Sequence, residues 1–266
     1  MKILIVTVPI RPEPTTFPPF GAMAVMNYVR KRGFPDISFY DIDCLRPSYE
    51  ETLAHLIAEK PEVLGISAVV STAYAYVKRL TLDVKKHLPG TLVVLGGNLA
   101  ASAELLLQRT GVDVCVSGEG EKTLLNLLRH WQANPGNMDF RAIPGLVFLY
   151  PDDRLHSTGY ADPLPGEELY DIDWSDLRKF SRFDHFFFPA FDETQGLMWP
   201  SGRYDSRSYE PERRNLFFGT IYIGKGCVAR CTFCHRWDKG IRHIPVDVLM
   251  PRIEEMIKEH NVERVA

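Results

Sequence analysis

The chain has 266 residues, of which 45% are hydrophobic and 24% are charged, and its formal net charge is −3. This composition is typical of a globular protein of one or two domains, and the charge does not favour nucleic acid or an anionic membrane as a partner. No apolar run approaches the roughly 18 residues that a membrane span needs. The apolar start of the chain is broken by Pro9, Arg11 and Pro12, so we expect a buried strand there rather than a signal peptide, and a cytoplasmic protein.

The first 135 residues alternate short apolar runs with amphipathic stretches. The runs are almost continuous in Val, Ile and Leu, which is typical of strands buried on both faces of a parallel sheet. The predicted strands are Lys2–Val8, Ile37–Ile42, Val63–Val69, Leu92–Leu95 and Val112–Val116. The stretches between them carry helix signals, so residues 1–135 are predicted to form a doubly wound parallel α/β domain. Ligands of such domains bind at the carboxyl ends of the strands.

Residues 136–215 lack a clear periodicity and are predicted to form an irregular connector, with one further strand at Ile143–Tyr150. The connector is rich in aromatic residues, which favours an ordered segment that packs on its neighbours. Residues 216–266 then open with a predicted strand at Leu216–Ile223, continue with a helix at Asp247–His260, and end in the start of another strand at Val262–Ala266.

Three of the five cysteines, Cys227, Cys231 and Cys234, fall within eight residues, whereas Cys44 and Cys115 are isolated. This is a poor disulfide framework and a good metal-binding pattern for a reducing compartment. Three thiolates on one loop can hold three irons of a [4Fe–4S] cubane and leave the fourth iron open to a small molecule. A structural zinc site is the alternative that the spacing leaves open.

The cysteine motif, with Phe233 just before its last cysteine, follows a predicted strand and precedes a predicted helix. This arrangement resembles the cluster loop of radical S-adenosylmethionine (SAM) enzymes. The resemblance implies that SAM chelates the open iron and that one-electron reduction cleaves it to a 5′-deoxyadenosyl radical, which abstracts hydrogen from a small-molecule substrate. It also implies that the backbone at Phe233 lies against the adenine and that an electron donor such as flavodoxin or ferredoxin is a partner.

Two further patterns resemble the flavodoxin-like cobalamin-binding domain of one large radical SAM subclass. Ser67-Ala68-Val69 is followed after 26 residues by Gly96-Gly97, and the segment Val116–Glu121 contains the letters GEGE. The resemblance implies cobalamin as a cofactor, and it implies contacts from Ser67, Gly96, Gly97, Gly118, Glu119 and Gly120. The histidine motif that supplies a cobalt ligand in many corrinoid proteins is absent, since Phe20–Val25 stands at its spacing and contains no histidine.

We therefore predict a cobalamin-dependent radical SAM enzyme, or the N-terminal portion of one, that transfers a methyl group to an unactivated carbon. A radical SAM domain is related to β/α barrels, and a full barrel takes about 250 residues. The 51 residues from Leu216 onward would supply only its first βα unit, so we expect a truncated chain. The alternatives are a non-catalytic corrinoid-binding module with a vestigial cluster loop and a zinc-stabilised α/β protein. A transfer RNA methylthiotransferase fits poorly, because only Cys44 and Cys115 remain for a second cluster.

Overall fold

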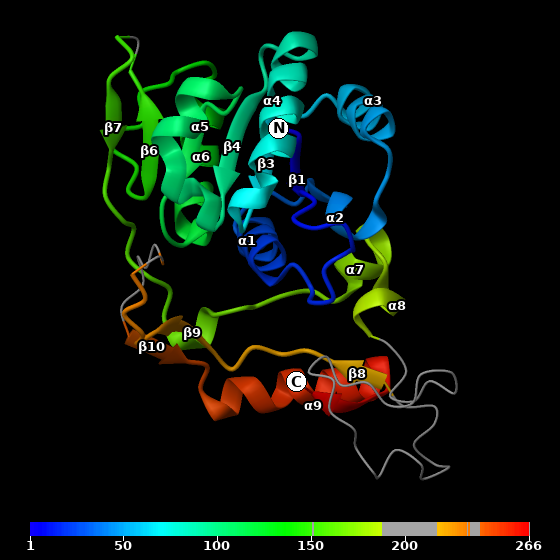
Figure 1. Cartoon of the computed structure of the whole chain (residues 1–266). Helices are drawn as coiled ribbons and strands as arrows, with labels where there is room; N and C mark the ends of the chain where they lie inside the picture. The colour runs from blue at the N-terminus through cyan, green and yellow to red at the C-terminus, as the bar shows by residue number, and fades with distance from the viewer. Residues whose placement is uncertain (151, 188–216, 233, 235–239, 266) are drawn as a thin grey trace.

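The computed structural model describes residues 1–150, 152–187, 217–232, 234 and 240–265. Its centre is a seven-stranded sheet with the order β2-β1-β3-β4-β5-β6-β7 (Figure 1). The five parallel strands are β1 (Ile3–Thr7), β2 (Ile37–Asp41), β3 (Val63–Ser67), β4 (Leu92–Gly96) and β5 (Val114–Val116). Each overlaps a predicted strand, and the predicted doubly wound parallel fold is confirmed.

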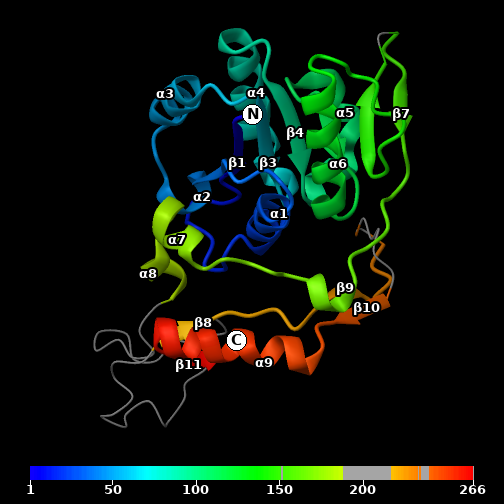
Figure 2. The ribbon, with the colours of Figure 1, turned by 180° about the vertical axis from the view of Figure 1, so that it is seen from behind.

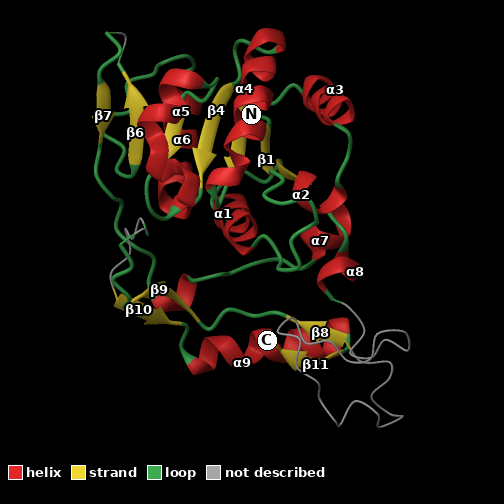
Figure 3. Cartoon of the chain, in the orientation of Figure 1, coloured by secondary structure: helices red, strands yellow, loops and turns green. Residues whose placement is uncertain are grey.

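Helices cover both faces of this sheet (Figures 2 and 3). One face packs on α1 (Phe20–Arg30) and α6 (Gly120–Ala133). The other face packs on α3 (Tyr49–Glu59), α4 (Tyr74–His87) and α5 (Ala103–Arg109), while the short α2 (Ile42–Leu45) follows β2 directly. Strand β1 shows why the apolar runs are continuous. Ile3 and Ile5 pack into the core on the side of α1 and α6, and Leu4 and Val6 pack into the core on the side of α3, α4 and α5.

The sheet continues beyond residue 135 into the predicted connector. Strand β6 (Leu146–Leu149), which falls within the predicted strand Ile143–Tyr150, pairs antiparallel with β5, and β7 (Leu155–Ser157) pairs antiparallel with β6. Strand β7 was not predicted, because its three residues lie at an edge of the sheet, where Leu155 and Ser157 are exposed and no apolar run marks the strand. The domain boundary at residue 135 stays a prediction, but the sheet itself extends to Ser157.

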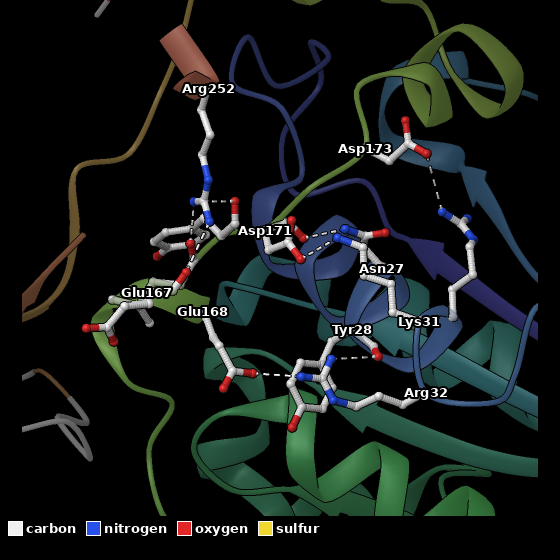
Figure 4. Close-up of polar contacts among 12 residues, drawn as sticks. Asn27, Tyr28, Lys31, Arg32, Glu167, Glu168, Asp171, Asp173 and Arg252 are labelled. Carbon is white, nitrogen blue, oxygen red and sulfur yellow. Dashed lines mark hydrogen bonds and ion pairs between the residues drawn. The ribbon is translucent and has the colours of Figure 1, made fainter. Parts of the chain in front are cut away.

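The rest of the described connector holds η3 (Gly166–Glu168), α7 (Ser175–Phe180) and α8 (Phe183–Phe186). Three basic residues, the last one of α1 and the two that follow it, pair with three acidic residues of the connector, and Figure 4 shows the pairs made by Lys31 and Arg32. The pairs are Arg30 with Asp176, Lys31 with Asp171 and Arg32 with Glu168, at N–O distances of 2.9, 2.6 and 2.8 Å. From the other side, Arg252 donates to the carbonyl oxygens of Glu167, Leu169 and Tyr170. The connector thus joins the sheet domain to the C-terminal segment.

The C-terminal segment contains a parallel pair and a hairpin. Strand β8 (Phe217–Gly219) pairs in parallel with β11 (Val262–Val265), and α9 (Val246–His260) precedes β11. Between β8 and α9, β9 (Gly224–Cys227) and β10 (Gly240–His243) form an antiparallel hairpin. This is the single βα unit with a following strand that the sequence predicted. Among the described residues, no helix has the length and apolar character to cross a membrane.

The turn after β4 gives a first test of the fold. Gly97 has φ +89°, and a Cβ atom there would lie 2.4 Å from the carbonyl oxygen of Ala68. We expect Gly97→Ala to lower the free energy of unfolding by about 1–3 kcal/mol, because the side chain meets both a disfavoured backbone conformation and a fixed backbone atom. Urea unfolding followed by circular dichroism would measure this change.

Gly90→Ala is the matched control, because a Cβ atom at Gly90 would have no atom within 4 Å. Its free energy of unfolding should stay the same or rise slightly, since alanine restricts the unfolded chain. Equal unfolding midpoints for the two variants would contradict the strained geometry of the turn at Gly97.

Candidate functional site

A cavity of about 530 Å³ opens at the carboxyl ends of the parallel strands. It gathers six residues from three loops that are far apart in the sequence. These are Ser67 at the end of β3, Gly96 and Gly97 at the end of β4, and Gly118, Glu119 and Gly120 between β5 and the start of α6. All six are the residues that the motifs singled out as cofactor contacts. The parallel topology brings them together, because strands that run the same way end at the same edge. Their individual contacts with a cofactor stay a prediction.

The cavity continues down one face of the sheet, beneath α1 and α6. Its walls there include the mid-strand residues Ile5, Gly65 and Val94. Gly21 on α1 also lines it, and a Cβ atom at Gly21 would meet no atom within 4 Å. Small residues therefore keep an apolar extension open between the sheet and these two helices, next to the wider mouth at the strand ends.

Aromatic residues from outside the sheet domain line the cavity opposite the strand ends. Tyr170 and Phe186 come from the connector, and Tyr222 comes from the C-terminal segment. The ring of Tyr222 lies 4.4 Å from that of Phe20 and 5.0 Å from that of Tyr170. Burial raises the pKa of Tyr170 to about 12, so its phenol stays neutral at physiological pH. Sequence reasoning missed these residues, and their only signal was the aromatic richness of the connector.

Two acidic residues, Asp41 at the end of β2 and Asp43 in α2, lie at the mouth of the cavity. Asp41 accepts hydrogen bonds from Thr7 Oγ1 at 2.6 Å and from Ser181 Oγ at 2.5 Å, which ties the connector to the ends of β1 and β2. Burial raises the pKa of Asp41, although these two hydrogen bonds oppose the rise. Asp43 accepts from the backbone of Thr15 at 3.0 Å. Both carboxylates line the cavity, and their hydrogen bonds fix the segments around its mouth.

The carboxylate of Glu119 points at the hairpin of the C-terminal segment. It pairs with Arg242, lies 3.3 Å from Nζ of Lys225, and accepts from the backbone of Leu164 at 2.7 Å. Burial alone would raise the pKa of Glu119, but the hydrogen bond from Arg242 and the charge of Lys225 hold it below its usual value. The side chain that the motif assigned to the cofactor is thus engaged by protein cations at the cavity wall.

Glu121, two residues further on, behaves differently. Its side chain is almost fully buried, its Oε1 lies 3.7 Å from Lys225 Nζ, and its Oε2 has no hydrogen-bond partner in the described part of the chain. Burial raises the pKa of Glu121, and the charge of Lys225 opposes this only in part. The two glutamates of one loop therefore have pKa values shifted in opposite directions.

The three clustered cysteines lie at and after the end of β9. Cys227 is the last residue of that strand, and the side chains of Cys227, Cys231 and Cys234 are exposed. The backbone amide of Ala229 donates to Cys227 Sγ at 3.3 Å, a contact that suits a thiolate ligand of an iron–sulfur cluster. The donor set of three thiols fits a cubane with one open iron. Phe233, whose backbone the resemblance places against the adenine of SAM, lies outside the described residues.

A different group of side chains is close enough to hold a metal ion. In the described part of the chain, Glu255, Glu259 and His260 are the group whose potential ligand atoms all lie within 4.8 Å of one another. The guanidinium of Arg178 lies 3.3 Å from Nδ1 of His260, and it places a positive charge beside the imidazole. This cluster therefore gives no support to a second metal centre.

The fold and the cavity define a class of protein, an α/β domain with a ligand cavity at its strand ends joined to the first βα unit of a second domain. Residues 8–128 match the model of the B12 binding domain family. The resemblance to cobalamin-binding radical SAM proteins that the motifs indicated is confirmed by the relatives described next.

Two curated relatives differ in the reactions that their names describe. One is the anaerobic magnesium-protoporphyrin IX monomethyl ester cyclase of Cereibacter sphaeroides, which is 25% identical over 93% of this chain and 36% of the relative. The other is the cytidylyl-2-hydroxyethylphosphonate methyltransferase of Streptomyces wedmorensis, which is 24% identical over 76% of this chain and 38% of the relative. The chain thus spans less than half the length of these proteins.

Two solved structures share the fold across almost the whole chain. The cobalamin-dependent S-adenosylmethionine radical enzyme OxsB with aqua-cobalamin bound has a TM-score of 0.69 at 15% identity, covering 97% of this chain and 32% of OxsB. The radical S-adenosylmethionine methyltransferase TsrM from Kitasatospora setae, with cobalamin and a [4Fe–4S] cluster bound, has a TM-score of 0.64 at 17% identity, covering 98% and 47%. At these identities the likeness shows the fold.

The burial of the cysteines predicts their reactivity. Cys44 and Cys115 are buried, and burial raises the pKa of both thiols, that of Cys115 to about 12. Because the thiolate is the reactive form, we expect three thiols to react rapidly with a chromogenic disulfide reagent at pH 8 and two to react only after unfolding. In the variant with serine at residues 227, 231 and 234 the rapid phase should vanish, whereas a surviving rapid phase would show that Cys44 or Cys115 is accessible.

Proposed function

We propose that this chain carries the cobalamin-binding and cluster-binding parts of a cobalamin-dependent radical SAM enzyme. The observation that carries the proposal is the single cavity that gathers all six motif residues at the strand ends of a B12 binding domain. Lys225, two residues before Cys227, lines this same cavity. Strand β9, which ends at Cys227, therefore begins at the wall of the cavity. We divide the chain accordingly into a cobalamin-binding domain (1–135), a connector (136–215) and the start of a radical SAM domain (216–266).

The cavity suits cobalamin in shape and polarity. Its mouth, bounded by glycine turns at the strand ends, admits the backbone close to a large flat macrocycle. The apolar extension past Gly21 and Gly65 suits a long arm that ends in a flat base. The rings of Phe20, Tyr170 and Tyr222 pack together on the opposite side and offer the cofactor an apolar wall. No histidine is among the described residues that line the cavity, so we propose that the cofactor binds without an imidazole ligand from this wall.

Cys227, Cys231 and Cys234 would hold the [4Fe–4S] cluster, with the backbone at Phe233 against the adenine of SAM. When bound, the reduced cluster supplies the electron that cleaves a carbon–sulfur bond of SAM, and cobalamin supplies a cobalt centre that can carry a methyl group. The exposed thiols suit a reducing compartment such as the cytoplasm. An electron donor such as flavodoxin or ferredoxin and a small-molecule substrate complete the proposal.

We favour methyl transfer to an unactivated carbon as the overall reaction. A methyltransferase is among the curated relatives, and one of the solved structures of the same fold is a methyltransferase. Cyclisation is the second candidate, because the relative that covers 93% of this chain is named as a cyclase. Both reactions would use the same cavity and the same three cysteines.

Anaerobic reconstitution tests the proposal directly. Iron, sulfide, zinc and corrinoid are quantified in one sample of the chain, with the Cys227/Cys231/Cys234→Ala variant as control. We expect about four irons and four sulfides per chain, lost in the variant, together with bound corrinoid. Zinc without labile sulfide would favour the zinc-stabilised protein instead, whereas corrinoid without a redox-active cluster would favour the non-catalytic binding module.

Gly21 offers a test of the cavity alone. We expect Gly21→Leu to weaken hydroxocobalamin binding at least about tenfold, because the leucine side chain would occupy open space in the cavity while favouring the helix that begins at Phe20. Titration followed by the cobalamin absorption spectrum measures the affinity. Gly90→Leu, a glycine with equally open surroundings that does not line the cavity, should bind as the unaltered chain does. Equal affinities in both variants would place the corrinoid elsewhere.

A further inference from the structure

The hairpin that carries Cys227 has two cations on one face. Lys225 and Arg242 stand directly opposite each other across β9 and β10. Residues opposite one another in an antiparallel pair point to the same face, and like charges in that position destabilise the pairing. A two-stranded hairpin this short is also marginal by itself. The hairpin therefore depends on groups outside it that neutralise these two charges.

Glu119, in the loop after β5, supplies the negative charge that neutralises these two cations. Nη2 of Arg242 donates to Oε1 of Glu119, and Nη1 lies 3.5 Å from Oε2 and also donates to the carbonyl oxygen of Leu164. Lys225 Nζ lies 3.3 Å from Oε1 of Glu119. The side chain of Glu119 is only 3% exposed, while those of Lys225 and Arg242 are 20% and 23% exposed. A two-pronged contact between arginine and a carboxylate fixes orientation as well as distance. The hairpin is thus held in one orientation against the cavity wall.

The first cysteine lies close to Lys225 on the same strand. Cys227 follows Lys225 by two residues on β9, with Gly226, whose φ is +108°, between them. Their Cα atoms are about 6–7 Å apart along the strand. The pairing of Gly240 with Cys227 and of Arg242 with Lys225 shows that the register is regular between these two positions. Glu119 therefore lies close to the point where a group bound to Cys227 would begin.

We propose that Glu119, Lys225 and Arg242 form a positioning clamp that sets the cysteine hairpin, and hence a cluster on it, at a fixed place relative to the ligand in the cavity. The identity of the two bound groups rests on the proposed function, whereas the clamp itself does not. Glu119 acts here as a positioning residue, through the hairpin, rather than through contact with a reacting atom. The two halves of the site are then built as one unit, although they lie more than 100 residues apart in the sequence.

Hydrogen exchange tests the clamp without any cofactor. In Glu119→Gln the two cations would lose the carboxylate that they share, while Lys225 keeps Glu121 at 3.7 Å, so peptides that cover 222–228 and 240–245 should exchange at least about tenfold faster than in the unaltered chain. Peptides from β1 should exchange at the unaltered rate. Glu104→Gln removes an exposed carboxylate from the same domain and should change neither region.

Arg242→Gln tests the clamp from its other side and replaces the first variant if Glu119→Gln does not fold. The double variant Glu119→Gln/Arg242→Gln should exchange no faster than the more affected single variant, because both partners of the pair are then neutral. Unchanged exchange of the hairpin in both single variants would overturn the clamp. Faster exchange throughout the sheet would also overturn it, since Glu119 would then support the domain fold instead.

Spin–spin interaction tests the positioning role in the loaded protein. With cob(II)alamin and a reduced cluster both present, electron paramagnetic resonance should show faster cobalt relaxation in the unaltered chain than in Arg242→Gln at equal content of cofactors. Equal relaxation in the two proteins would overturn the positioning role. A chain that takes up no corrinoid would count against the proposed function, while the exchange experiment would still decide the clamp.

Discussion

The site depends on one constraint, that five parallel strands end at the same edge of a sheet. The loops after β3, β4 and β5 must meet there, whatever their separation in sequence. Gly97 makes this meeting possible, because its backbone passes the carbonyl of Ala68 with no room for a side chain. The cavity is therefore a consequence of topology first and of particular side chains second, which explains why short glycine motifs could indicate it.

The wall of the cavity opposite the strand ends comes from the connector and the C-terminal segment, and charged contacts hold these segments in position. Three ion pairs fasten the connector to the end of α1 and the two residues after it, and Arg252 fastens α9 to the connector through three backbone carbonyls. Helix α1 also lines the cavity with Gly21 and Ala22. One helix thus serves as a wall of the ligand cavity on its inner face and as the docking surface of the connector on its outer face. Tyr170 reaches the cavity because the residues on either side of it are held in this way.

Prediction from sequence succeeded where local pattern determines structure. The five apolar runs fixed the parallel strands because each is buried on both faces, and the spacing of Cys227, Cys231 and Cys234 stood out because the donors are adjacent. It failed for Tyr170 and Tyr222, whose place depends on tertiary contacts that leave no period in the sequence. Glu119 shows the intermediate case: the motif singled out its loop, which lines the cavity, but a motif states neither where a side chain points nor that Arg242 is its partner.

There is also a physical reason why the clamp consists of ion pairs and not of apolar contacts. Burying a carboxylate and two cations costs solvation free energy that their attraction need not recover, so an apolar contact of equal size could hold the hairpin at least as strongly. An apolar contact, however, tolerates sliding and rotation, whereas a carboxylate gripped by both prongs of Arg242 and by Lys225 has one good geometry. Glu121 supports this view, since its buried Oε2, which has no hydrogen-bond partner among the described residues, is a cost that stability alone would remove. The loop after β5 therefore places charge where orientation matters, at the junction between the cavity and the cysteine strand.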